Sequence, residues 1–226
     1  MPLAGPQLRP LGVLPGLGGS FGELARYGQL DRLLNYYIPA WLEQFPAVRF
    51  FSFEPERLGD FTSDREVLRR VELIAPRSVG STRLHAIWLG VGRGRARLRS
   101  CALVRVLQAP GGVAPALAGA PFVCTYGYSY QNLTTAPFEG PLKGTALAAK
   151  RAAMQAVLTL ILRRAEATIV TSIIGETEAR ALGARRIACI PNGVDLDLFT
   201  PRRSEKDYDV VFVGRLAPEK DLPTLL

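Results

Sequence analysis

The chain has 226 residues, 48% of them hydrophobic, and a formal net charge of +8, so it is long and apolar enough for a buried core. Two explanations of the positive charge remain open. It can reflect the amino-acid bias of a GC-rich coding sequence, or it can form a basic surface that attracts anionic lipid or a polyanionic substrate. Nucleic acid is disfavoured, because no basic motif interleaved with aromatic residues is present. The chain has one histidine, His85, and three widely spaced cysteines, Cys101, Cys124 and Cys189. Their spacing matches no metal-binding motif, and the cysteines are predicted to be reduced and buried in the core.

Short apolar segments alternate with helical stretches along the chain. Seven of these segments are predicted strands: residues 11–14, 48–53, 71–74, 103–107, 122–126, 167–171 and 187–190. Their apolar residues do not alternate with polar ones, which is typical of strands covered on both faces. The alternation with helices predicts an α/β fold with a doubly wound, Rossmann-like parallel sheet.

The predicted helices complete this organisation. A long amphipathic helix is predicted at residues 21–42, with Pro39 kinking it or starting a new turn. Two more are predicted at residues 142–164 and 176–182, and an eighth strand at 209–213 follows a polar linker at 201–207. We therefore expect one domain at residues 1–200, with residues 201–226 forming the linker and the start of a second.

No targeting segment is expected. Residues 1–10 contain three prolines and no apolar run, unlike a signal peptide. The longest apolar stretch, residues 152–174, is interrupted by Arg163, Arg164 and Glu166 and falls short of a membrane span. We expect a cytoplasmic protein.

A glycine-rich turn, residues 16–22, follows the first strand and opens a helix. Such turns can present backbone N–H groups to a phosphate. A dinucleotide-binding turn would need an acidic residue after the second strand, and Glu54 is placed there. However, Phe21 stands where the pattern G-x-G-x-x-G needs glycine, and Glu54 lies more than thirty residues beyond Gly22, against about twenty in that motif. A turn required only for close packing is the other alternative.

Two further candidates lie between the first turn and the chain's last segment. His85 lies in the middle of a predicted helix and is interpreted as structural or surface rather than as a general base. The fifth strand ends at residues 125–130 on a glycine and three tyrosines. Strand carboxyl ends line the ligand crevice of open α/β sheets, so these rings serve either as a sugar platform or as packing under the next loop.

The most informative segment is the last one. The seventh strand ends at the tight turn Asn192-Gly193, a pair suited to positive φ. The eighth predicted strand then ends at Gly214, followed by Arg215 and Lys220. A glycine there lets the backbone approach a ligand, and the two cations suit a diphosphate.

This segment resembles the inter-domain region of retaining glycosyltransferases of the GT-B fold, glycosyltransferase family 4. Their pattern is Pro-Asn-Gly-Val-Asp at a strand end, Phe-x-Pro, Val-Gly-Arg-Leu and Glu-Lys. The matching residues are 191–195, Phe199 with Pro201, 213–216 and 219–220. Several elements match in order, and the rest of the chain resembles the family more loosely.

The resemblance implies transfer of a sugar, with retention, from a nucleotide-sugar donor to a glycan or lipid-linked acceptor in envelope biosynthesis. The acceptor hydroxyl would attack on the leaving-group side, with no dedicated nucleophile, no metal and no cofactor beyond the donor. The implied diphosphate-binding residues are Gly18, Gly19, Gly214, Arg215 and Lys220, since fixed cations and amides stabilise the leaving charge. The implied acceptor or cleft residues are Ser20, Tyr126, Tyr128 and Asn192.

The resemblance also implies a second Rossmann-like domain with a Glu-x7-Glu motif, which these 226 residues do not contain. We therefore expect a fragment that is inactive alone, from an enzyme attached peripherally to the inner face of an anionic membrane. Two alternatives remain open: a non-catalytic module binding a glycan or partner, and an NAD-type or nucleotide-sugar enzyme using the first turn.

Overall fold

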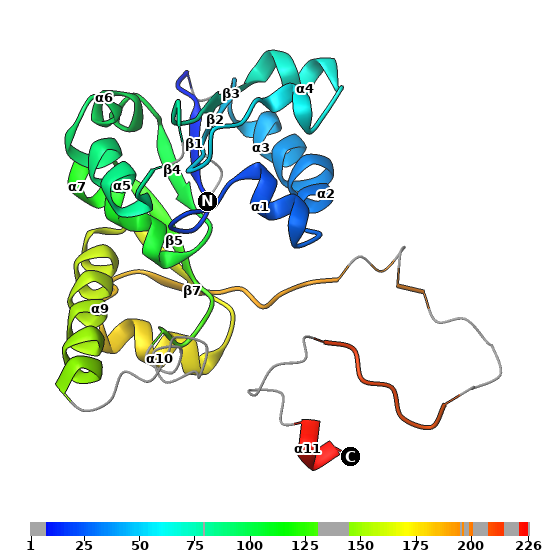
Figure 1. Cartoon of the computed structure of the whole chain (residues 1–226), viewed down its shortest axis with the longest axis vertical. Helices are drawn as coiled ribbons and strands as arrows, with labels where there is room; N and C mark the ends of the chain where they lie inside the picture. Colours follow the sequence, from blue (N-terminus) through cyan, green and yellow to red (C-terminus); the bar gives the residue numbers. More distant parts are fainter. Residues whose placement is uncertain are drawn as a thin grey trace.

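The fold is built around one parallel sheet. The computed structural model describes residues 8–78, 80–130, 145–194, 196, 199–200, 208–214 and 222–225. Seven strands in these ranges pair in the order β3-β2-β1-β4-β5-β6-β7, all parallel (Figure 1). They are β1 (Leu11–Leu14), β2 (Val48–Phe51), β3 (Val71–Ile74), β4 (Leu103–Val106), β5 (Phe122–Tyr126), β6 (Ala167–Val170) and β7 (Ile187–Cys189). The predicted doubly wound α/β sheet is confirmed.

Helices cover both faces of the sheet. Those between β1 and β3 are α1 (Phe21–Arg26), α2 (Leu30–Arg32), η1 (Leu33–Tyr37), α3 (Ile38–Gln44), η2 (Leu58–Asp60) and α4 (Arg65–Arg70). Those after β3 are α5 (Thr82–Val91), α6 (Gly94–Arg99), η3 (Ala109–Gly112), α7 (Val113–Ala118), α9 (Thr145–Arg164), α10 (Ile173–Ala181) and α11 (Leu222–Leu225). Figure 1 shows α1 to α4 on one side of the sheet and α5, α6, α7 and α9 on the other. Right-handed crossovers produce this arrangement, because the strand order runs one way from β1 to β3 and the other way from β4 to β7.

The core consists of two clusters, one on each face. Leu11 and Val13 of β1 belong to the cluster that contains Phe21 of α1. Leu14 belongs to the other, with Ile161 of α9. All four residues of β1 are therefore buried, as expected for a strand covered on both faces.

The predicted continuous helix at residues 21–42 is wrong. The chain breaks after α1 at Gly28, whose φ of +64° lies in the left-handed region that favours glycine. Residues Leu33–Tyr37 then form a π-helical turn before Pro39 in the first turn of α3. Proline has no N–H to donate to the preceding turn, and a wider turn accommodates that loss. Of the two alternatives predicted for Pro39, a kink or a new turn, the structure has the change from π-helix to α-helix just before Pro39, without a break in the helix.

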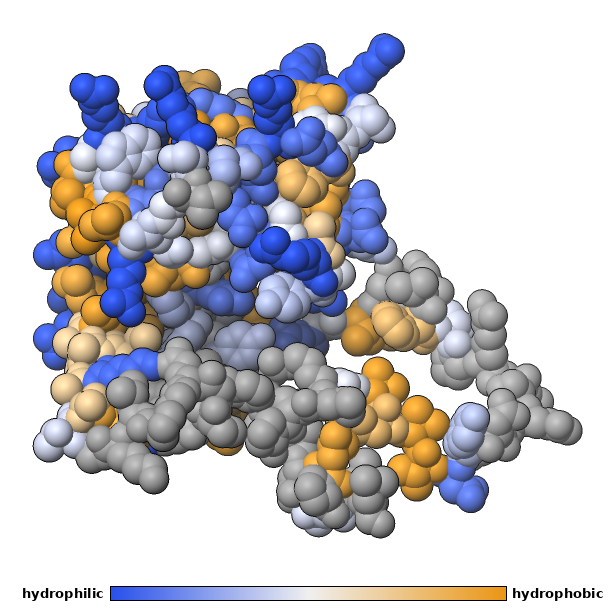
Figure 2. All heavy atoms as spheres, viewed as in Figure 1, coloured by the Kyte–Doolittle hydropathy of each residue, from blue (hydrophilic) through white to orange (hydrophobic). Residues whose placement is uncertain are grey.

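The predicted eighth strand at residues 209–213 is also wrong. The structure describes residues 208–214 without a strand, and their apolar side chains are exposed, Val213 by 91% (Figure 2). A strand needs a hydrogen-bonded neighbour, and this segment pairs with none of the seven described strands. The predicted linker at 201–207 lies outside the described residues, and the domain division at residue 200 stays a prediction.

The cysteines and α9 refine two other predictions. Cys101 and Cys124 are buried and free, but Cys189 is exposed, because β7 is an edge strand with little covering it. The predicted helix at 142–164 is observed from Thr145, and residues 142–144 lie outside the described part. By length and composition alone, α9 is long and apolar enough to cross a membrane. Only 17% of its most apolar window is buried in the structure.

Candidate functional site

The candidate site lies at the carboxyl edge of the sheet. Strands β1 and β4 are neighbours, but the chain leaves β1 toward α1 on one face and leaves β4 toward α7 on the other. Ligands of open α/β sheets bind at this switch point, in the crevice beyond the strand ends. The loops after β1, β2, β4 and β5 surround it, and they contain Gly18, Gly19, Ser20, Glu54 and Tyr128.

The turn after β1 is tightly constrained. Gly18 has a φ of +91°, and a Cβ on Gly19 would lie 2.6 Å from Pro15 Cβ. The Gly19 N–H bonds to Gly16 O at 3.2 Å, and Gly19 O accepts from the Phe53 N–H at 3.1 Å. Gly18 is thus required by its left-handed φ and Gly19 by close packing against Pro15, which favours the alternative that the glycines of this turn serve the fold.

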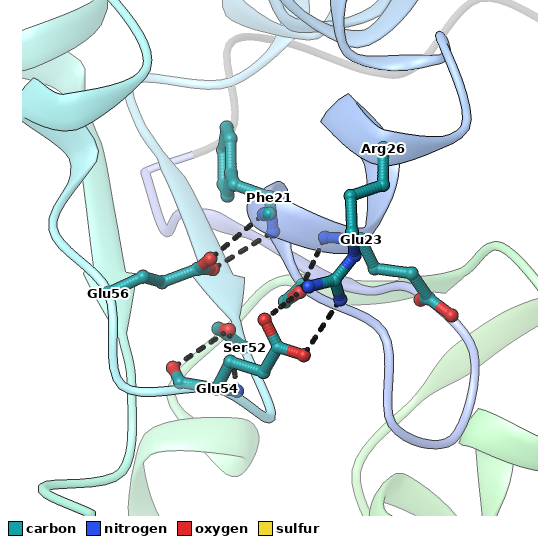
Figure 3. A network of polar contacts seen from close by, with 8 residues as sticks. Phe21, Glu23, Arg26, Ser52, Glu54 and Glu56 are labelled. Atoms are coloured by element: carbon teal, nitrogen blue, oxygen red, sulfur yellow. Dashed lines mark hydrogen bonds and ion pairs between the residues drawn. The ribbon is translucent and has the colours of Figure 1, made fainter. Parts of the chain in front are cut away.

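The N-terminus of α1 is already occupied by a carboxylate of the loop after β2, that of Glu56 (Figure 3). Glu56 Oε1 accepts from the Phe21 N–H at 2.9 Å, and Glu56 Oε2 accepts from the Gly22 N–H at 3.0 Å. The third amide, of Glu23, donates to Ser20 Oγ at 2.8 Å. These three amides are among those that a helix cannot satisfy itself, and here each has a partner from the chain.

Ser20 connects this helix to Glu54. Its hydroxyl is fully buried and donates to Glu54 Oε2 at 2.9 Å. The other carboxylate oxygen of Glu54 pairs with Arg26 at 3.0 Å, at the protein surface. Burial raises the pKa of Glu23, the nearby charge of Glu54 raises it further, and Arg26 opposes both. Ser20, predicted to face an acceptor, thus uses its hydroxyl twice within the chain.

His85 lies beside this network, on α5 as predicted. Its Nε2 is 3.2 Å from Ser52 O, its ring stacks on Trp88 with centroids 5.4 Å apart, and Phe53 meets it edge-on. Burial lowers its pKa, partly offset by the contact with Ser52. The contacts of the ring with Trp88, Phe53 and Ser52 favour the structural interpretation.

The tyrosines after β5 differ strongly in exposure. Tyr126 is 1% exposed, and its hydroxyl donates to Glu178 of α10 at 2.9 Å. Ser129 donates to the other oxygen of Glu178 at 2.8 Å, which ties the loop to that helix. Tyr128 is 57% exposed. Of the two tyrosines predicted to line the cleft, only Tyr128 is exposed.

The remaining predicted residues are dispersed. Asn192 follows β7 at the same edge and is exposed, and Gly214 lies in the exposed segment that forms no strand. Arg215 and Lys220 lie outside the described residues. Gly18, Gly19 and Ser20 lie in one turn at the carboxyl edge of the sheet. Gly214 does not lie at the end of a strand of this sheet, contrary to the prediction.

Sequence reasoning missed two residues. Glu56 gave a weak signal, as a second acidic residue just after Glu54. Arg105, inside the apolar strand β4, gave none: its guanidinium donates to Val106 O and to Thr125 Oγ1, both at 2.7 Å. Burial lowers the pKa of Arg105. Val106 ends β4 and Thr125 lies one residue before the end of β5, so this cation lies near the carboxyl edge of the sheet.

The other surface features give less support for a functional site. A hollow of about 520 Å³ between η1 and η2 is lined by Asp31, Asp60, Phe61 and others. Asp64, also in its lining, caps α4 through the amides of Glu66 and Val67. Among the described residues, no three His, Cys, Asp or Glu side chains are grouped to hold a metal ion.

No protein-family model matches the chain, and neither does any curated protein. The motifs near the C-terminus and the geometry of the sheet edge are therefore the two sources for a functional conclusion.

Proposed function

We propose that this chain is the N-terminal, acceptor-side part of a retaining GT-B glycosyltransferase. The observation that carries the proposal is the ordered run of motif residues from Pro191 to Lys220, which follows directly on the last strand of a doubly wound parallel sheet. In such a sheet, a chain that leaves the carboxyl end of its last strand starts from the ligand-binding edge. The whole enzyme would move a sugar from a nucleotide sugar to a glycan or lipid-linked acceptor.

The proposed chemistry needs cations at the leaving group. As the bond between sugar and diphosphate breaks, negative charge grows on the phosphate oxygen, and fixed positive charges lower the barrier. Arg215 and Lys220, with the Gly214 backbone, take this role by motif. The nucleotide sugar is the co-substrate, and neither a metal nor another cofactor is part of the proposal.

The acceptor would approach from the carboxyl edge. Tyr128 offers an exposed ring beside this edge, and Asn192 an exposed amide after β7. An aromatic ring provides an apolar platform and an amide provides hydrogen bonds, which together suit a sugar. The Ser20 hydroxyl is engaged with Glu54 and the Glu23 amide and would have to exchange partners to join them.

The test is sugar transfer by the natural gene product with a panel of nucleotide sugars. Arg215→Ala and Lys220→Ala should each lower kcat by about 10²–10³, whereas the control variants Arg202→Ala and Lys206→Ala should leave it unchanged. Transfer with retained anomeric configuration supports the proposal. Equal loss in all four variants, or none, would contradict it.

A glycan-binding module without catalysis is favoured by one observation, the exposed Tyr128 beside a buried, rigidly held Tyr126. Saturable glycan binding in the absence of any nucleotide binding would support that function instead.

We also propose a cytoplasmic protein held peripherally at the inner face of the cell membrane. The net charge of +8 supports this, as does α9, which carries Lys150, Arg151, Arg163 and Arg164 and no acidic residue. Anionic lipid attracts such segments. Flotation with anionic and neutral vesicles tests it, and equal binding to both would exclude an electrostatic attachment.

A further inference from the structure

The turn after β1 is the place where this fold would hold the phosphate of a nucleotide. Two oxygens of one Glu56 carboxylate accept from two successive amides, those of Phe21 and Gly22, at 2.9 and 3.0 Å. Two oxygens of a phosphate group would use the same amides. Since the Glu23 amide is bonded to Ser20 Oγ, no amide of the first three in α1 is left for a ligand.

The space beside these amides is filled as well. A Cβ built on Gly22 would lie 3.2 Å from Glu54 Oε2 and 3.6 Å from Glu56 Oε2. The absent side chain of Gly22 therefore makes room for the two carboxylates of this chain. A bound phosphate would have to displace them.

The charges around the turn oppose an added anion. Glu23, Glu54 and Glu56 surround the first turn of α1, and Arg26 is the cation that is paired with Glu54. A diphosphate would bring further negative charge next to three carboxylates, and like charges at such separations repel.

We infer that Glu56 is an internal anion that occupies the phosphate position of the turn after β1 and closes this turn to nucleotide phosphates. A dinucleotide does not fit, because Glu54, the residue placed to hold its ribose, is bonded to Ser20 and Arg26. One consequence rests on the proposed function: the donor diphosphate is then held by Gly214, Arg215 and Lys220 without the backbone of Gly18 and Gly19.

The test follows the Phe21 and Gly22 amides by NMR, using hydrogen exchange and chemical shift with inorganic pyrophosphate as the probe. In the parent protein, pyrophosphate should change neither amide. In Glu56→Ala, exchange of both amides should accelerate by about tenfold or more, as expected for the loss of a charge-assisted hydrogen bond. Pyrophosphate should then restore protection. The matched control is Glu43→Ala, at an exposed glutamate on α3.

Three results would overturn the inference. Saturable movement of both amides in the parent would mean that the turn is open. Unchanged exchange in Glu56→Ala would mean that the carboxylate does not hold the amides, and faster exchange without rescue would make Glu56 an ordinary helix cap. Glu56→Ser, whose side chain is too short to reach the two amides, replaces the alanine variant if that does not fold. None of these readouts involves sugar transfer, so a failed transferase proposal leaves them intact.

Discussion

Replacing Ser20 with alanine tests the network at the first turn most directly. The hydroxyl caps α1 by accepting from the Glu23 N–H at 2.8 Å, and the loss of a serine cap costs about 1 kcal/mol. It also donates to Glu54 at 2.9 Å, and a hydrogen bond to a charged group contributes about 1.5–3 kcal/mol when buried. Because the Glu54 side chain is 38% exposed, water replaces much of that bond, and about 1 kcal/mol remains.

Ser20→Ala should therefore lower the free energy of unfolding by about 2 kcal/mol, which for a chain of this length corresponds to about 4–8 °C in Tm. Urea unfolding followed by tryptophan fluorescence measures the change. Ser172→Ala is the matched control, because Ser172 caps α10 through the Gly175 N–H at 3.1 Å but is exposed. Its loss should be about 0.5–1 kcal/mol. Equal losses in the two variants would refute the contribution of Glu54 to the network.

Three further predictions follow from individual residues. Gly18→Ala should cost about 1–2 kcal/mol because of its positive φ, whereas Gly59→Ala, with open space around its Cβ position, should stay within about 0.5 kcal/mol; urea midpoints compare them, and equal values would contradict the strain argument. Cys189 should react with a thiol reagent in the folded protein, while Cys124, whose pKa burial raises to about 11, should react only after unfolding; similar rates in native buffer would contradict this. Because burial lowers the pKa of His85 in the folded state, the unfolded chain binds this proton more readily, so stability falls as the pH drops below about 6.5. His85→Gln should reduce that fall in urea titrations between about pH 7 and 5, and an unchanged pH dependence would exclude the effect.

The strands could be predicted because burial on both faces leaves a local signature. In β1, for example, Leu14 faces one core cluster while Leu11 and Val13 pack against the other, so the segment has no polar side chain. The boundaries within the predicted long helix could not be predicted correctly. The π-helical turn before Pro39 depends on how the backbone adjusts to the N–H group that proline lacks, and the sequence pattern does not show this adjustment. The segment at 209–213 has the same apolar run as a real strand, but pairing depends on a neighbour that the pattern does not reveal.

The position of the candidate site could also be predicted, from the glycine-rich turn after the first strand. Its chemistry could not. Glu56 and the amides of Phe21 and Gly22 are separated by 35 and 34 positions, and the loop that carries Glu56 has no periodic pattern. In the same way, Tyr126 is buried and Tyr128 is exposed, although two residues at that spacing on a strand would face the same side. Strand β5 ends at Tyr126, and the sequence does not reveal the path of the loop that follows.

The pairing of β1 with β4 has a consequence for synthesis on the ribosome. Leu11 pairs with Leu103, so β1 cannot pair with β4, its second neighbour, until the intervening chain has been translated. Strands β1 to β3 and helices α1 to α4 can assemble earlier, because their connections are short. Until β4 arrives, the free edge of β1 and the side chains of Leu14 and Phe51 on the opposite face stay uncovered. That intermediate has the unpaired edge and apolar surface that chaperones recognise and that promote misassembly.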